Sequence, residues 1–163
     1  MQAQHQDSSG SAIRSTGTAM SALAGTIWAL PLSLVGLMIA LPVLLSGGHL
    51  TMAPALRIVV AGRRRGPLPA LLVRGRLGDF LLAHHPFGAM HAMAIGHVVF
   101  TDRRATSRRL LVHELAHVAQ AARWGVLFPF AYLAASIWAF RCGGDAYWDN
   151  VFEVAARKAE QHA

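Results

Sequence analysis

Cysteine and charged residues are scarce in this chain, and each scarcity excludes something. Cys142 is the only cysteine among 163 residues, so no disulfide can form within the chain. That pattern suits a reducing compartment, because disulfides persist in oxidising ones. Charged residues make up only 14% of the chain and hydrophobic residues 54%, which excludes an intrinsically disordered protein and favours contact with a membrane. The length allows one modest domain and an appendage.

Acidic residues are fewer than basic ones. Eight Asp and Glu stand against fifteen Lys and Arg, which gives a formal net charge of +7. Such a surplus can face anionic lipid headgroups or nucleic acid. The sequence has no basic patch interleaved with aromatic residues and no nucleic-acid motif, so we expect membrane lipids as a partner and no nucleic acid.

Charge is absent altogether from residues 15–56. Residues 1–18 are rich in Gln, Ser, Thr and Gly and predict a polar, disordered tail. Residues 19–46 predict a transmembrane helix, because about 20 apolar residues suffice to cross a bilayer. Pro31 and Pro42 would kink or shorten this helix. A cleaved signal peptide is the alternative, although the apolar run exceeds the usual length of such peptides.

Arginine is distributed unevenly around that segment. Its amino-terminal side carries only Arg14 and Asp7, whereas arginines crowd its carboxyl-terminal side at positions 57, 63, 64, 65, 74 and 76. Positive residues stay on the cytoplasmic side of a membrane. We therefore expect a single-pass membrane protein whose C-terminal domain lies in the cytoplasm.

Residues 47–93 predict a basic juxtamembrane segment and the start of the core, built from short strands or one interfacial helix. The core itself is predicted over residues 94–163. It opens with a strand over Ala94–Phe100, followed by a helix over Ala105–Arg123 that Thr106 or Ser107 can cap.

A second uncharged stretch covers residues 124–140. Its 17 residues are at the lower limit for a membrane span. Pro129 interrupts it, so we expect a turn and then a helix from about Ala131. This helix would be buried under the preceding one or would lie in the headgroup layer.

The predicted helix over residues 105–123 carries the pattern H-E-x-x-H. His113 and His117 are four residues apart, so both imidazoles lie on one helix face and can bind one ion. Glu114 lies beside them and can accept a proton from a metal-bound water. The pattern predicts a catalytic zinc site.

A catalytic zinc usually has three protein ligands, so one more is needed. Among the downstream acids Asp145, Asp149, Glu153 and Glu160, we predict Glu153, which begins a helix among apolar residues. The alternative is a capping box, in which Asn150 is the N-cap and Glu153 satisfies a backbone N–H.

His113, Glu114 and His117, followed by Glu153 on a later helix, resemble the gluzincin branch of the zincin metallopeptidases. The resemblance covers roughly residues 95–160. It implies an α+β, zincin-like minimal core that is mostly helical with a small sheet, a Zn²⁺ cofactor, and protein or peptide substrates. It also implies that Glu114 is the general base, and that the strand before the active helix lies along the cleft.

Two related branches fit less well. Metzincins have a Gly and a third His after the motif, where this chain has Gln120 and Arg123. Aspzincins use a downstream Asp in a different motif, which Gly143-Gly144-Asp145 matches only loosely.

The oxyanion of a peptidase reaction needs a further donor, for which Tyr147 and His97 are the candidates. Ordinary packing is the alternative for both residues. Two other functions remain open: a non-catalytic zinc-binding scaffold or sensor in a membrane, and a basic lipid-binding protein in which the H-E-x-x-H pattern is accidental.

Overall fold

The computed structural model describes residues 23–66, 68–85, 88–104 and 107–163. At its centre is a four-stranded sheet in the order β1-β4-β6-β5. β4 and β6 run parallel, and the outer strands run antiparallel to their neighbours. A separate antiparallel hairpin is formed by β2 and β3. The strands are β1 (His49–Met52), β2 (Ile58–Val60), β3 (Arg63–Arg65), β4 (Leu71–Arg74), β5 (Ala92–Ile95) and β6 (Val98–Thr101).

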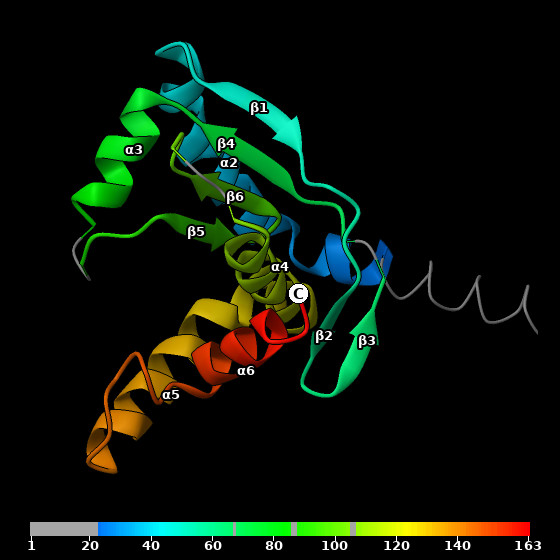
Figure 1. Ribbon diagram of the computed structural model, residues 1–163, viewed down its shortest axis with the longest axis vertical. Coiled ribbons are helices and arrows are strands. Elements are labelled where there is room, and N and C mark those ends of the chain that lie inside the picture. Colours follow the sequence, from blue (N-terminus) through cyan, green and yellow to red (C-terminus); the bar gives the residue numbers. More distant parts are fainter. Residues whose placement is uncertain (1–22, 67, 86–87, 105–106) are drawn as a thin grey trace, which may run out of the picture.

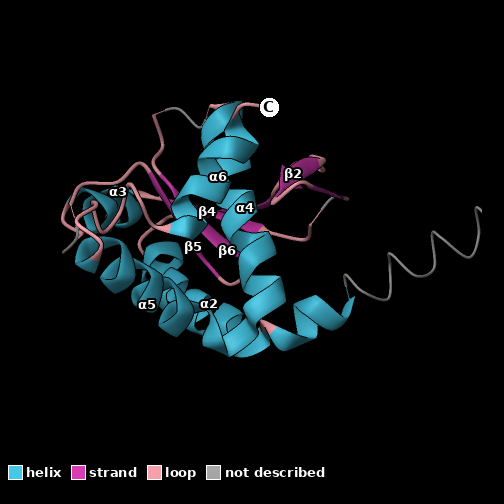
Figure 2. Ribbon diagram, turned by 90° about the horizontal axis from the view of Figure 1, so that it is seen from below, coloured by secondary structure: helices cyan, strands magenta, loops and turns pink. Residues whose placement is uncertain are grey.

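Helices cover the sheet on both sides (Figure 1). They are α2 (Leu30–Leu45), α3 (Arg76–Ala83), α4 (Arg108–Trp124), α5 (Phe128–Arg141) and α6 (Val151–Glu160), with a single 3-10 turn η1 (Gly125–Leu127) between α4 and α5. Figure 2 shows α2 and α5 along one side of the molecule, with α6 and β2 toward the other. This mixture of helix and sheet confirms the α+β part of the prediction.

The central strands are apolar on both faces, because each face is covered by a helix. Leu72 of β4 and Val99 of β6 belong to a cluster with the apolar side of α4. Their neighbours Val73 and Val98 point the other way, into a second cluster that includes Val43 of α2. The sheet is therefore the middle layer between α2 and α4.

α2 approaches the turn between β5 and β6 very closely. A Cβ atom added to Gly36 would lie 2.7 Å from the carbonyl oxygen of Ile95. Gly96 has a φ of +61°, and a Cβ atom there would lie 2.5 Å from the backbone nitrogen of Ser33. The Ser33 hydroxyl accepts a hydrogen bond of 3.0 Å from the backbone N–H of His97. Only small residues at these positions allow the helix to reach the turn.

The prediction of a transmembrane helix over residues 19–46 is wrong. The apolar segment divides at Ala29, just before Pro31, which cannot donate a backbone hydrogen bond. α2 has 16 residues, or about 24 Å at the usual rise, against roughly 30 Å of hydrocarbon. In the part of the chain that the structure describes, no helix is long and apolar enough to cross a membrane. The single-pass placement with a cytoplasmic catalytic domain depended on that helix and is overturned with it.

Other boundaries shift for local reasons. The single strand expected over Ala94–Phe100 is a hairpin, because Gly96 turns the chain between β5 and β6. Ser107 caps α4, as predicted, by accepting a hydrogen bond from the Leu110 N–H. Pro129 lies in the first turn of α5, where a missing N–H costs nothing, so this helix begins at Phe128 rather than at Ala131. The predicted tail, residues 1–18, lies outside the described residues.

The close approach of α2 to the sheet predicts a steric effect at Gly36. Gly36→Val should lower the free energy of unfolding by about 1–3 kcal/mol, the usual cost of overpacking. Gly66→Val is the matched control, because a Cβ atom at Gly66 meets nothing within 4 Å. Thermal melts of both variants test this, and equal midpoints would contradict the packing of α2 described here.

Candidate metal centre

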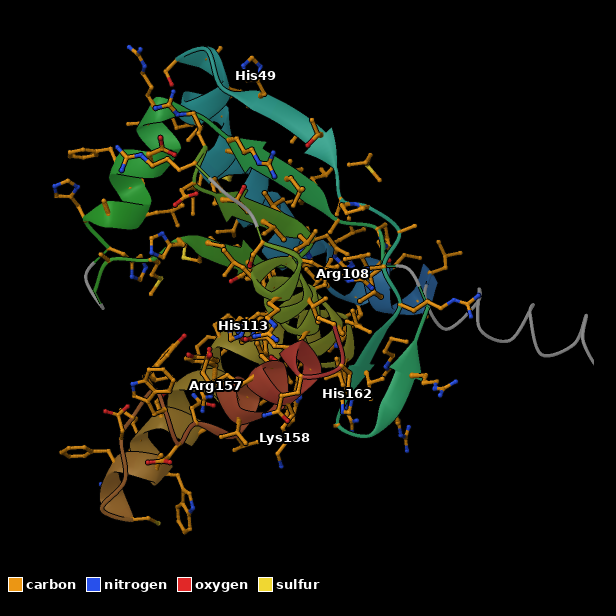
Figure 3. The ribbon with its side chains drawn as sticks, in the orientation of Figure 1. His49, Arg108, His113, Arg157, Lys158 and His162 are labelled. Carbon is orange, nitrogen blue, oxygen red and sulfur yellow. The ribbon has the colours of Figure 1, made fainter. Side chains whose placement is uncertain are left out.

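α4 carries both histidines through the middle of the molecule. All eleven residues from Leu111 to Ala121 are buried, so the helix is enclosed on every side. Leu115 and Val118 pack in the core cluster beneath the sheet. The opposite side of the helix presents His113 and His117 toward α5 and α6. Figure 3 shows His113 at the place where these helices meet.

Asn150 fixes the start of α6, which supplies the third residue. Its side-chain oxygen accepts a hydrogen bond of 2.9 Å from the Phe152 N–H, so it is the N-cap. Its amide group donates to the carbonyl oxygen of Tyr132 and to the hydroxyl of Ser136, both on α5. The backbone N–H of Asn150 donates to the carbonyl oxygen of Tyr147. Glu153 is therefore not needed to complete a capping box.

The carboxylate of Glu153 instead faces the two histidines. Its Oε1 lies 3.2 Å from Nε2 of His117, and its Oε2 lies 3.3 Å from Nε2 of His113. The two Nε2 atoms are 3.1 Å apart. Each of the three buried residues offers one ligand atom, and these atoms lie within 4.8 Å of one another. The group can hold a metal ion.

The Nδ1 atoms of both imidazole rings point away from the cluster and are hydrogen-bonded, as expected for metal-binding histidines. Nδ1 of His113 lies 2.5 Å from Oε1 of Glu160, and Nδ1 of His117 lies 2.8 Å from Oε1 of Gln120. Both oxygens are acceptors, so each Nδ1 carries a proton and each Nε2 can direct a lone pair to a bound metal ion. The amide of Gln120 donates in turn to the carbonyl oxygen of Phe152, which ties this support to α6. The donor set of two nitrogens and one oxygen suits a zinc ion.

The residues of this cluster strongly shift one another's pKa values. Burial alone would lower the pKa of His113, but the adjacent carboxylate of Glu153, the charge of Glu114 and the hydrogen bond to Glu160 raise that pKa to about 9. Burial alone would raise the pKa of Glu153, but the adjacent His113 and His117 and the hydrogen bond from Tyr132 hold that pKa well below its usual range. The site therefore favours positive charge between its ligands.

Glu114 lies beside the cluster and is nearly enclosed. Its pKa is raised, chiefly by burial, although the nearby histidines and the backbone amide of Ala94 oppose that shift. Its Oε2 is buried and makes no hydrogen bond within the described part of the chain. A carboxylate oxygen without a hydrogen-bond partner, beside a group that can hold a metal ion, is suited to receive a proton.

Two tyrosines lie near Glu153, and the sequence analysis named only Tyr147 as a candidate site residue. Tyr132 of α5 donates a hydrogen bond of 2.8 Å to Oε1 of Glu153. Tyr147 lies near enough for Glu153 to act on its pKa: burial, followed by the charge of Glu153, raises the pKa of this tyrosine to about 12. Tyr132 was missed because its sequence context is only a uniform apolar helix.

The remaining candidates lie outside the cluster. His97 is buried in the turn between β5 and β6, where its Nδ1 lies 3.1 Å from the hydroxyl of Ser33. The His97 ring therefore contacts α2, and its role as an oxyanion donor stays a prediction. Asp149 accepts a hydrogen bond from the backbone N–H of Asp145, so both of these acids order the loop before α6.

No protein-family model, curated protein or solved structure matches this chain. The resemblance to gluzincins stays a prediction from His113, Glu114, His117 and Glu153.

The geometry predicts which residues a metal ion needs. His113→Ala or His117→Ala should abolish binding of Zn²⁺ or Co²⁺, and Glu153→Ala should nearly do so, because each removes one of three protein ligands. Asp149→Ala is the control and should retain the metal. Metal content after loading and desalting, measured by mass spectrometry, tests this. Loss of metal in Asp149→Ala with retention in Glu153→Ala would contradict the ligand set.

Tyr132→Phe removes only the hydroxyl that orients Glu153. We expect zinc affinity to fall roughly 10- to 100-fold, as is usual when a partner of a metal ligand is lost. Competition with a chelating dye measures the affinity, and the visible spectrum of the Co²⁺ form should shift. An unchanged affinity and spectrum would show that Glu153 is held without Tyr132.

Proposed function

We propose that this chain is a zinc-dependent metallopeptidase that hydrolyses peptide bonds in proteins or peptides. The observation that carries the proposal is the convergence of His113, His117 and Glu153 next to a buried carboxylate, Glu114. A structural metal site needs no such base and normally has four protein ligands. Three ligands with an adjacent proton acceptor are the pattern of a hydrolytic site.

Zinc bound at these three residues would polarise the substrate carbonyl and lower the pKa of a bound water toward neutrality. The remaining steps, which transfer protons, are carried out by protein side chains. Glu114 accepts the proton of the attacking water and then delivers it to the leaving amine. The raised pKa of Glu114 suits both transfers, because a base works best when its pKa lies near the pH of the reaction.

β5 provides a place for an extended substrate. It is the last strand in the sheet order β1-β4-β6-β5, so its outer edge has no strand partner among the described residues. The backbone amide of Ala94 in this strand lies near enough to Glu114 to act on its pKa, so this edge lies beside the proton acceptor. A peptide that pairs with this edge by main-chain hydrogen bonds would pass the metal ligands.

Tyr147 is the side chain best placed to stabilise the oxyanion. Its hydroxyl remains protonated at neutral pH, since its pKa is raised to about 12. It lies close enough to Glu114 and Glu153 for both charges to act on that pKa. Asp145 accepts hydrogen bonds from the backbone N–H groups of Tyr147 and Trp148, which fixes the loop that presents the ring.

Glu114→Gln separates catalysis from metal binding. The variant keeps its size and leaves all three ligands in place, so it should bind zinc as the wild type does. Its rate of peptide hydrolysis should fall roughly 10²- to 10⁴-fold, the usual contribution of a general base. Cleavage of a mixed peptide library, followed by mass spectrometry, measures the rate.

The wild-type reaction should stop on chelation and return when zinc is restored. Full activity in Glu114→Gln would refute the proposed mechanism. A zinc-loaded wild type that cleaves no peptide would favour the non-catalytic scaffold instead.

A further inference from the structure

α2 has the reverse of the usual arrangement of side chains on a packed helix. Its inward side consists of small residues, among them Ser33, Gly36 and Ala40, which lie against the sheet. Its large side chains point outward, and Met38 and Leu45 are 73% and 80% exposed. A helix on a water-facing surface normally buries its large apolar residues and exposes polar ones. The outer side of α2 therefore has the chemistry of an interface.

α5 continues the same surface. Phe130 and Trp138 are 70% and 71% exposed, and Leu133 and Ile137 are exposed beside them at helical spacing. The turn η1, which exposes Val126 and Leu127, contacts α2 and thereby links the two helices. Figure 2 shows α2 and α5 along one side of the molecule. We call this surface the apolar face: the exposed side chains of α2, η1 and α5.

The composition of the apolar face distinguishes a lipid surface from a protein partner. Protein interfaces carry roughly one hydrogen bond per 100–200 Å² and a polar rim that fixes register. α2 and residues 128–140 contain no charged side chain, and the serines Ser33 and Ser136 are engaged inside the molecule. Lipid chains need no such groups.

The edges of the apolar face match a lipid headgroup layer. Trp28, Trp124 and Trp138 are exposed, and amphipathic indole rings are enriched at the boundary between membrane and water. Arg123 and Arg141 are exposed at the ends of α4 and α5. Together with the net charge of +7, they complement anionic headgroups.

We propose that the apolar face binds the surface of an anionic phospholipid membrane, with α2 and α5 lying in the plane of the interface. No helix crosses the bilayer in this arrangement. The apolar side chains enter the boundary between headgroups and acyl chains, as those of interfacial helices do. Tyr132 contacts Glu153 from the inner side of α5, so the metal centre lies about one helix diameter, roughly 10 Å, from the lipid.

Vesicle flotation of the intact protein tests the proposal. The wild type should float with vesicles of phosphatidylcholine and phosphatidylglycerol in a 3:1 ratio. Two arginines at the rim should make binding to pure phosphatidylcholine roughly 30-fold weaker. Met38→Glu and Trp138→Glu, on different helices, should each weaken binding at least about 10-fold, because each puts a charge where an apolar side chain enters the lipid. Met38→Gln and Trp138→Gln repeat the test without adding charge.

Met52→Glu is the matched control. Met52 is an equally exposed methionine at 65%, but it lies on β1 rather than on the apolar face, so binding should be unchanged. Thermal melts establish that each variant is folded. Failure of the wild type to float, or equal loss in Met52→Glu, would overturn the proposal. So would a dimer in vesicle-free buffer that Met38→Gln and Trp138→Gln dissociate, since a second copy of the chain would then occupy the face.

Discussion

Three ligand groups converge in a buried space, and the rest of the structure is arranged to make that possible. Two imidazole nitrogens and a carboxylate lie within hydrogen-bond distance of one another at His113, His117 and Glu153. Lone pairs facing each other in a low-dielectric interior repel unless a positive charge lies between them. Glu160 and Gln120 strengthen this demand, because they fix both Nδ1 atoms as donors. The cluster can therefore hold a cation.

Asn150 connects that cluster to the fold. It is completely buried, and its single side chain caps α6 while donating to two groups on α5. The position of Glu153 on α6 and that of Tyr132 on α5 are thus set by the same residue. Capping alone would explain an asparagine at this position. Its burial and its two hydrogen bonds to α5 show that it also connects α6 to α5. This is how a small chain holds three helices in register around a polar centre.

The local part of the site could be predicted from sequence, and the tertiary part could not. His113 and His117 share a helix face by periodicity, and Glu153 stands among apolar residues that predicted its burial. Tyr132 gave no signal, because its role depends on α5 folding back against α6. The hairpin of β5 and β6 was missed because one glycine, Gly96, turns a run of strand-forming residues whose composition does not change.

The transmembrane prediction failed for a related reason. Mean hydropathy treats a segment as uniform, but the side chains on the two sides of α2 differ in size rather than in polarity. Ser33, Gly36, Ala40 and Val43 recur every three or four residues and form the side that lies against the sheet. Small residues at that spacing allow close approach to a neighbouring element, so their periodicity was the available signal that the helix packs on protein. The large side chains left outward then account for a hydrophobic content that one small core cannot bury.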